Sequence, residues 1–281
     1  MAVILDGKAF AAIVKEKTKD EVARLGLTPS LAVVIVGDDP ASRVYVNGKK
    51  KDCAECGIRS EEFTLAADVG QEKLLSLVEE LNNRDDINGI LVQLPLPKGY
   101  DEQAVIAAIN PNKDVDAFHM ENIGRIMDGN FTFAPCTPYG VMRLLEHHGI
   151  DPAGKHCVVV GRSNIVGKPM AMLMLHKHAT VSIAHSRTPD LGAMTRQADI
   201  LVAAVGKPNL ITADMVKPGA VVIDVAINRG DDGKLCGDVD YAPVAEVASY
   251  ITPVPGGVGP MTRAILMENT VIAAKKAAGK F

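Results

Sequence analysis

Residues 33–58 read VVIVGDDPASRVYVNGKKKDCAECGI and join a strand pattern to a helix pattern at Gly37. Ser42 stands near the start of the helix and is expected to cap it. Tyr45 and Lys49 are four residues apart, which places the phenol and the ammonium group on one face of the helix. Such a pair can move protons on a small heterocyclic ligand. Because Lys49 also opens a run of three lysines, a solvated helix surface remains open as the alternative.

Strand and helix patterns alternate on both sides of this segment. In the first half, helices are expected at 7–25, from residue 42 and at 71–81, and strands at 31–36, 61–65 and 89–94. In the second half, a helix opens at residues 137–138, and strands are expected at 156–161, 180–185, 199–205 and 220–225. This rhythm predicts parallel sheets covered by helices. We therefore expect two three-layer α/β lobes, with a boundary between Phe118 and Pro135.

The composition excludes several classes of protein. The chain has 281 residues, of which 47% are hydrophobic and 23% charged, so it can form two ordinary domain cores. A net charge of -4 and a pI near 6.0 argue against nucleic acid as a partner. Its apolar runs are strand-sized, which argues against a membrane span, and no secretion signal opens the chain. Five cysteines, an odd number, favour a reducing compartment. We expect a cytoplasmic protein.

The second lobe opens with the sequence of a dinucleotide site. Residues 158–169, VVVGRSNIVGKP, combine a strand, a glycine turn and a helix start, although the spacing departs from a strict GxGxxG. The next strand ends in Ser186 and Arg187, where NAD-preferring folds place an acidic residue for the ribose hydroxyls. A hydroxyl and a guanidinium suit a 2′-phosphate instead, and Arg162 would add a second cation. The pattern favours NADP, with an ordinary surface loop as the alternative.

Five motifs, in order along nearly the whole chain, carry a resemblance to a known family. They are Ser42-x-x-Tyr45-x-x-x-Lys49, residues 92–97 (VQLPLP), residues 113–116 (KDVD), residues 161–167 (GRSNIVG) and residues 255–262 (PGGVGPMT). With them the chain closely resembles the bifunctional methylenetetrahydrofolate dehydrogenase/methenyltetrahydrofolate cyclohydrolase family. The resemblance implies a folate-binding catalytic domain at 1–120, an NADP-binding Rossmann-type domain at 138–260, and a cleft between the two lobes. We expect the helix at 261–281 to pack back on the first domain.

The resemblance also implies roles for individual residues. Lys49 would be the key cyclohydrolase residue, Tyr45 would shape the pocket and stack on the folate, Gln93 would position the Lys49 amine, and Asp116 would bind the pterin ring. The expected substrate-binding residues are Ser42, Tyr45, Gln93, Leu94, Pro95, Asp116, Pro255, Gly256 and Gly257. The expected cofactor-binding residues are Gly161, Arg162, Ser163, Ile165, Val166, Gly167, Ser186, Arg187, Ile227, Gly259 and Thr262. No metal is expected, and the family implies a homodimer.

The implied activity is oxidation of 5,10-methylenetetrahydrofolate with NADP⁺, followed by hydrolysis of the methenyl product to 10-formyltetrahydrofolate. A dehydrogenase with little cyclohydrolase activity and a silent NADP-binding regulatory protein are the alternatives. Two residues depart from the family pattern, because Ala117 and Ala226 stand where glycine is usual. We expect both activities to survive these added methyl groups. The Cys53-x-x-Cys56 pair is expected to serve helix packing rather than redox chemistry or zinc binding.

Overall fold

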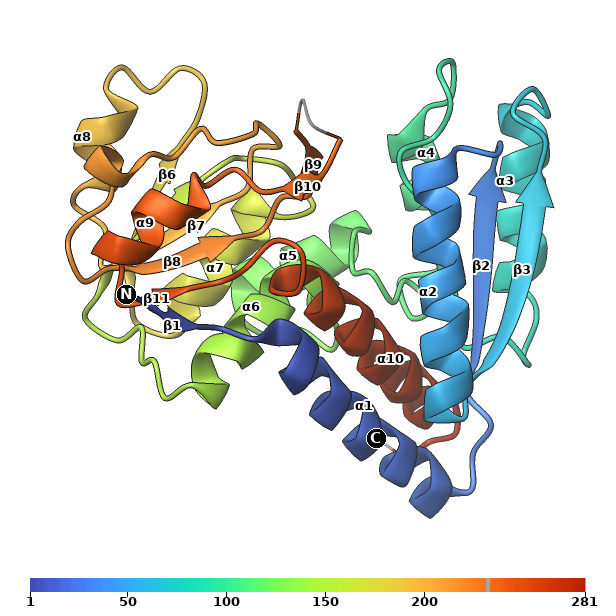
Figure 1. The fold of residues 1–281 in the computed structure, drawn as a ribbon. Helices are drawn as coiled ribbons and strands as arrows, with labels where there is room; N and C mark the ends of the chain where they lie inside the picture. The colour runs from blue at the N-terminus through green and yellow to red at the C-terminus, as the bar shows by residue number, and fades with distance from the viewer. Residues whose placement is uncertain (231–232, 281) are drawn as a thin grey trace. The chain divides into compact units, whose positions relative to one another are not determined.

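The computed structural model describes residues 1–230 and 233–280, and its contacts divide the chain into two compact units (Figure 1). The six-stranded unit comprises residues 1–11 and 135–262, and the three-stranded unit comprises residues 12–134 and 263–281. The boundary falls inside two helices, α1 (Gly7–Leu25) and α10 (Val258–Ala277). Phe281, with which the expected C-terminal segment ends, lies outside the described residues.

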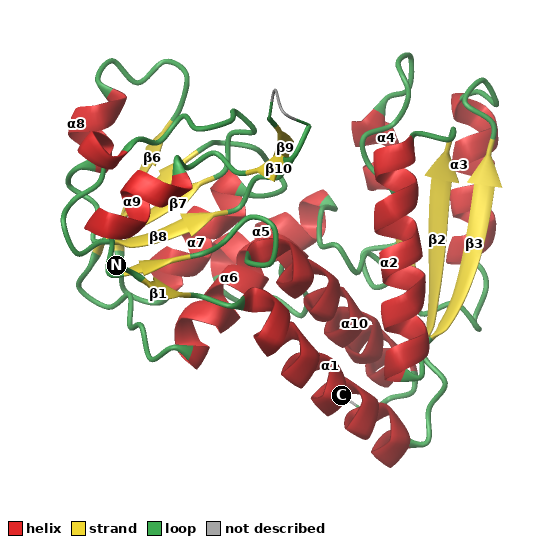
Figure 2. Ribbon diagram, viewed as in Figure 1, coloured by secondary structure: helices red, strands yellow, loops and turns green. Residues whose placement is uncertain are grey.

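The three-stranded unit is built on a parallel sheet in the order β3-β2-β4, with β3 at Arg59–Leu65, β2 at Ser30–Val36 and β4 at Gly89–Val92. Every residue of β2 is buried, as expected for a central strand covered on both faces. Its helices are α2 (Pro40–Cys56), α3 (Gln71–Asn82), α4 (Glu102–Ala108) and α5 (Met120–Asp128), together with the larger parts of α1 and α10. Figure 2 shows α2 and α3 on different sides of the strands.

The period of two along β2 explains these layers. Ala32, Val34 and Val36 join one core cluster with residues of α3, among them Leu74 and Val78. The residues between them on β2 point to the other face, because successive side chains of a strand alternate. The strand is therefore apolar from Leu31 to Val36, and helices pack against both of its faces.

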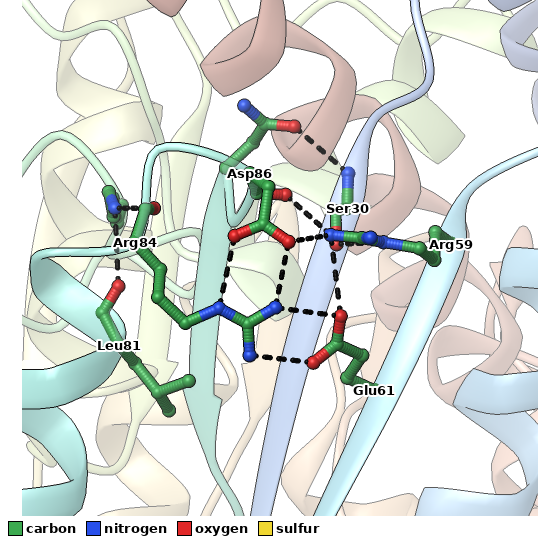
Figure 3. Close-up of polar contacts among 8 residues, drawn as sticks. Ser30, Arg59, Glu61, Leu81, Arg84 and Asp86 are labelled. Atoms are coloured by element: carbon green, nitrogen blue, oxygen red, sulfur yellow. Dashed lines mark hydrogen bonds and ion pairs between the residues drawn. The ribbon is translucent and has the colours of Figure 1, made fainter.

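An ion-pair network fastens β3, the edge strand, to the turn before β4 (Figure 3). The Arg84 guanidinium donates to both oxygens of Glu61, at 2.8 and 2.9 Å, and to Asp86 at 3.0 and 2.7 Å. Arg59 also pairs with Asp86. The two arginines lower the pKa of Glu61, mainly through the hydrogen bonds from Arg84. The network holds the register of a strand that has a neighbour on one side only.

The six-stranded unit has a parallel sheet in the order β1-β11-β8-β7-β5-β6. The strands are β1 (Val3–Ile4), β5 (His156–Val160), β6 (Thr180–Ala184), β7 (Ile200–Ala203), β8 (Val221–Asp224) and β11 (Tyr250–Ile251), and β9 (Asn228–Arg229) forms a hairpin with β10 (Leu235–Cys236). The helices are α6 (Cys136–His147), α7 (Gly167–His176), α8 (Leu191–Thr195), α9 (Tyr241–Val247) and the 3₁₀ helix η1 (Ala213–Met215). Two α/β units with parallel sheets confirm the predicted fold class.

The position of the N-terminal residues differs from the expected one. The sequence grouped residues 1–11 with the first lobe, whereas Val3 and Ile4 pair with Tyr250 and Ile251 at the edge of the six-stranded sheet. A two-residue strand is too short to carry a periodic signal, so only its long-range partner defines it. Among the described residues, no helix is long and apolar enough to cross a membrane.

Candidate active site

The helix α2 begins where β2 ends, and Asp39 caps it. The Asp39 carboxylate accepts a 2.8 Å hydrogen bond from the backbone N–H of Ser42, and Pro40 occupies the first turn. The prediction that Ser42 caps this helix is therefore wrong. The cap precedes the proline that starts the helix, so Ser42 lies inside the first turn. It is buried there, with 7% of its surface exposed.

Lys49 is buried on α2, with 8% of its surface exposed. Its ammonium group donates to Gln93 Oε1 at 3.0 Å. Gln93 follows β4 directly, and its Nε2 donates to the Leu94 carbonyl at 2.7 Å. The amide thus presents its oxygen to the lysine because its nitrogen is already engaged. The solvated-helix alternative does not hold for this lysine.

Tyr45 lies one turn before Lys49 and is 39% exposed, so one part of the phenol ring is open to a ligand. Burial of the rest raises the pKa of Tyr45, and the nearby positive charge of Arg263 opposes that shift. The phenol is therefore protonated at neutral pH and can donate a hydrogen bond.

The loop that carries Asp116 is anchored on both sides. Lys113 donates to the carbonyls of Leu81, Asn82 and Arg84 at the end of α3, at 3.2, 2.8 and 2.7 Å. Asp114 pairs with Ile90 of β4 in a parallel bridge, so the chain there runs toward the carboxyl end of β4, from which Gln93 also follows. Asp116 itself is half-buried. Both polar residues therefore emerge from one end of the sheet.

Asp114 holds the turn around Asp116. Its carboxylate is 2% exposed and accepts 2.8 Å hydrogen bonds from the His119 N–H and from Asn122 Nδ2. Burial raises the pKa of Asp114. Ala117, which directly follows Asp116, has φ of 58°. This is a left-handed conformation that favours glycine. The family departure at Ala117 thus lies at a position where a methyl group is strained, whereas Ala226 is not in the left-handed region.

The segment 253–262 of the six-stranded unit is packed too tightly for a side chain at Gly257 or at Gly7, which lies against it. A Cβ on Gly257 would lie 2.6 Å from the Pro253 carbonyl oxygen, and a Cβ on Gly7 would lie 1.8 Å from the Gly257 oxygen. The Gly256 carbonyl accepts from the Lys8 N–H at 2.8 Å. The expected folate residues Pro255, Gly256 and Gly257 therefore lie in a turn before α10 that packs closely against the start of α1. They belong to a different unit from Tyr45, Lys49, Gln93 and Asp116.

The turn after β5 is built as a cradle in the same unit. Gly161 has φ of 127°, and a Cβ there would lie 2.3 Å from the Ala204 oxygen. Gly167 opens α7 against Gly161, where a Cβ would lie 2.2 Å from the Gly161 oxygen. Ser163 Oγ accepts from the N–H groups of Val166 and Gly167 at 3.1 and 3.3 Å. Arg162, Ser163 and Ile165 are exposed around this turn.

The end of β6 presents a hydroxyl and a cation beside that cradle. The Gly161 N–H donates to the Ala184 carbonyl at 2.8 Å, which joins the two strand ends. A tight turn follows, in which His185 and Thr188 exchange backbone and side-chain hydrogen bonds at 2.8 and 2.9 Å. Ser186 and Arg187 project from this turn and are exposed. The arrangement fits a phosphorylated ribose, because among the described residues the Ser186 hydroxyl and the Arg187 guanidinium make no hydrogen bond and remain available as donors.

Ile227, Gly259 and Thr262 complete the expected cofactor residues. A Cβ on Gly259 would lie 3.3 Å from the Ile227 side chain, which is 40% exposed. The Thr262 hydroxyl lies 2.9 Å from that of Thr137. Both contacts connect the start of α10 to its own unit.

Two buried carboxylates near this region were missed by the sequence reasoning. Asp238 is fully buried and accepts from the N–H groups of Val205, Gly206 and Lys207 at 2.6, 3.0 and 2.7 Å. Asp224 accepts from the Asp238 N–H at 3.0 Å, and burial raises the pKa of Asp224 to about 6. They shape the loops after β7 and β8. Asp224 follows an apolar run, which many surface aspartates also do, and the residues around Asp238 carry no pattern that marks it as buried.

The two thiols of the Cys53–Cys56 pair have low reactivity. Cys53 and Cys56 are fully buried, and burial raises the pKa of each thiol to about 12. Thiols of that kind are poor nucleophiles and metal ligands at neutral pH, in agreement with a packing role. Within residues 1–230 and 233–280, no group of three or more His, Cys, Asp or Glu residues could hold a metal ion.

Comparison with known proteins connects both units to one family. Residues 5–116 match the family model described as the tetrahydrofolate dehydrogenase/cyclohydrolase catalytic domain. Residues 135–278 match the model described as the NAD(P)-binding domain of tetrahydrofolate dehydrogenase/cyclohydrolase. The chain is 60% identical over 281 residues to the bifunctional protein FolD of Magnetococcus marinus, covering 99% of each chain.

Solved structures give the same result. The bifunctional FolD methylenetetrahydrofolate dehydrogenase/cyclohydrolase of Campylobacter jejuni has a TM-score of 0.96 and 49% identity, over 98% of this chain and 99% of that one. The Trypanosoma brucei methylenetetrahydrofolate dehydrogenase-cyclohydrolase, solved with NADP cofactor and inhibitor, has a TM-score of 0.94 and 39% identity, over 99% of this chain and 98% of that one.

Proposed function

The chain belongs to the tetrahydrofolate dehydrogenase/cyclohydrolase family, and on that basis we propose that it oxidises 5,10-methylenetetrahydrofolate with NADP⁺ and hydrolyses the methenyl product, using Lys49 and its neighbours. The observation that carries the proposal is the buried Lys49 ammonium held by Gln93 at 3.0 Å. We assign folate binding to the three-stranded unit and cofactor binding to the six-stranded unit. The substrate-binding role of residues 255–257 is carried over from the family resemblance alone.

The cofactor residues fit NADP in two respects. The Gly161–Gly167 cradle leaves space that a Cβ would fill, and the exposed Arg162, Ser186 and Arg187 supply charge and donors for a 2′-phosphate. When bound, NADP⁺ accepts a hydride from the methylene carbon of the substrate. The chain's part in this step is to hold both molecules in line, since no proton is transferred.

Hydrolysis requires proton movement. Water adds to the methenyl carbon, and the added oxygen loses both of its protons as it becomes the formyl carbonyl. The departing nitrogen takes up one proton when the ring opens, so one proton is released overall. Lys49 is the basic group of α2 that is buried and held in place, and the Tyr45 phenol lies one turn away. We assign the transfer of these protons to Lys49, with Tyr45 stacking on the substrate and Gln93 orienting the amine.

Asp116 is assigned to the pterin ring. A carboxylate can accept from two adjacent ring N–H donors, and the Asp114 turn presents it without using it for internal structure. Within residues 1–230 and 233–280, the Asp116 side chain makes no hydrogen bond or ion pair. Ser42, Leu94 and Pro95 are assigned to the walls of the same site.

One assay tests the whole proposal. Purified protein is given 5,10-methylenetetrahydrofolate and NADP⁺, and NADPH, methenyltetrahydrofolate and 10-formyltetrahydrofolate are followed separately. Formation of NADPH and the formyl product is expected. NADPH with accumulated methenyltetrahydrofolate would favour a dehydrogenase with little cyclohydrolase activity, and no turnover would overturn the proposal. Family resemblance further supports a cytoplasmic homodimer, which light scattering of the purified protein and fractionation of the native cell would test.

A further inference from the structure

The Arg263 side chain packs against α2 and has no role in the reaction described above. It lies on α10 within the three-stranded unit, and its Nε pairs with Asp52 of α2 at 3.2 Å. Figure 1 shows α10 and α2 side by side. Asp52 is 2% exposed and is held in turn by Lys15 of α1 at 2.7 Å. A buried carboxylate between two cations fixes the direction of the arginine side chain.

Gly48 makes room for the guanidinium. An ideal Cβ on Gly48 would lie 2.2 Å from Arg263 Nη1, closer than any real contact. Glycine weakens the interior of a helix, and at position 48 the Arg263 guanidinium lies across it, so a side chain there would have to displace the end of the arginine. Gly48 stands between Tyr45 and Lys49 in sequence, so the guanidinium lies beside the proposed folate residues.

The outer nitrogens of Arg263 have donors to spare. Across the part of the chain that the structure describes, neither Nη1 nor Nη2 makes a hydrogen bond, and the side chain is 32% exposed. A guanidinium carries five N–H donors in a planar fork that matches a carboxylate. The Arg263 charge also reaches the Tyr45 phenol, whose pKa it lowers against the effect of burial.

We propose that Arg263 binds a carboxylate of the glutamate part of the folate substrate, and that Asp52 and Gly48 position it for that purpose. The inference rests on the proposed stacking of the substrate on Tyr45. The aminobenzoyl group of folate ends in glutamate, so a ligand stacked on a partly exposed Tyr45 extends its anionic end toward solvent, where Arg263 lies. Arg263 would then set the preference for glutamate-bearing substrates without touching the reacting carbon.

The test compares two substrates that differ only in this part, 5,10-methenyltetrahydrofolate and 5,10-methenyltetrahydropteroate, which lacks the glutamate. Arg263→Gln should raise KM for hydrolysis of the first by about ten-fold, the scale of one charged hydrogen-bonded pair, and change KM for the second less than two-fold. The kcat for both should stay within about two-fold, since no transition-state contact is lost. Arg263→Lys should restore part of the affinity.

Two further variants keep the test sharp. Gly48→Ala, which displaces Nη1, should raise KM for the glutamate-bearing substrate alone, and it serves if Arg263→Gln fails to fold. Arg24→Gln removes an exposed arginine of the same unit and should change neither substrate. Equal KM changes for both substrates, or none, would overturn the inference while leaving the proposed function intact. Failure of the unmutated protein to hydrolyse either substrate would overturn both.

Discussion

The Lys49 ammonium group donates to Gln93 Oε1 at 3.0 Å, from a helix and a strand end that are 44 residues apart in sequence. The lysine is buried and the amide is locked by its own bond to the Leu94 carbonyl. A lysine in such a place has one orientation, and its proton affinity depends on the groups around it. This relationship makes the two steps of the proposed reaction separable by mutation.

Lys49→Met keeps the aliphatic length of the side chain and removes the ammonium. Hydrolysis of methenyltetrahydrofolate should fall by roughly 10² or more, the scale for losing a general acid or base. Hydride transfer should fall much less, so methenyltetrahydrofolate accumulates when NADP⁺ is supplied. Lys50→Met, which alters an exposed neighbour, is the control. Hydrolysis at the unmutated rate in Lys49→Met would show that another group moves the protons.

Gln93→Ala removes the oxygen that orients Lys49. We expect a smaller loss of hydrolysis than in Lys49→Met, because the amine remains but is no longer held in one position. The pH dependence of kcat should shift as well, since the neighbour that binds the ammonium has gone. Stopped-flow measurement of methenyl hydrolysis across pH tests this. A loss as large as that of Lys49→Met, with an unchanged profile, would indicate that Gln93 itself takes part in the chemistry.

Asp116→Ala should weaken both activities together, because both use one bound pterin. The loss in kcat/KM should be about 2–4 kcal/mol if the paired hydrogen bonds are shielded from water. Asp116→Asn, which keeps one acceptor, should lose less. Thermal unfolding of each variant separates this from damage to the loop, which Asp114 holds independently. Damage to one activity alone would contradict the assignment.

The cofactor preference should depend on the cations around the β5 and β6 turns. We expect NADP⁺ to exceed NAD⁺ in kcat/KM by at least about ten-fold, or 1.4 kcal/mol, a modest demand on charged hydrogen bonds. Arg162→Ala should reduce the NADP⁺ value and leave the NAD⁺ value nearly unchanged, which makes NAD⁺ the internal control. Steady-state assays with both cofactors measure this preference. Equal kcat/KM values for NADP⁺ and NAD⁺ in the unmutated protein would refute it.

Ala117→Gly should stabilise the protein. A left-handed alanine costs about 1–2 kcal/mol, and glycine costs about 0.5–1 kcal/mol in lost chain entropy, so a net gain of about 0.5–1 kcal/mol is expected. Ala226→Gly is the matched control, because Ala226 is not in the left-handed region and should lose stability instead. Urea unfolding of the three proteins measures this, and a destabilised Ala117→Gly would show that the methyl group is needed for packing.

The sequence by itself determined the local elements, because each depends on periodicity and on residues a few positions apart. The apolar run of β2, the glycine turn after β5 and the Tyr45–Lys49 spacing were all readable in this way. The motif order also identified the family. The capping residue of α2 was not predicted correctly: the sequence pointed to Ser42, whereas Asp39 provides the cap.

Only the tertiary structure decided which distant residues meet. The Gln93 amide on Lys49, the Asp114 anchor beneath Asp116 and the Arg263 guanidinium across Gly48 each join segments at least eight residues apart, or on different elements. The two-residue β1 likewise has no signal until it pairs with β11. Such contacts depend on how sheets and helices pack, and burial then sets their strength. Sequence patterns reveal neither this packing nor this burial.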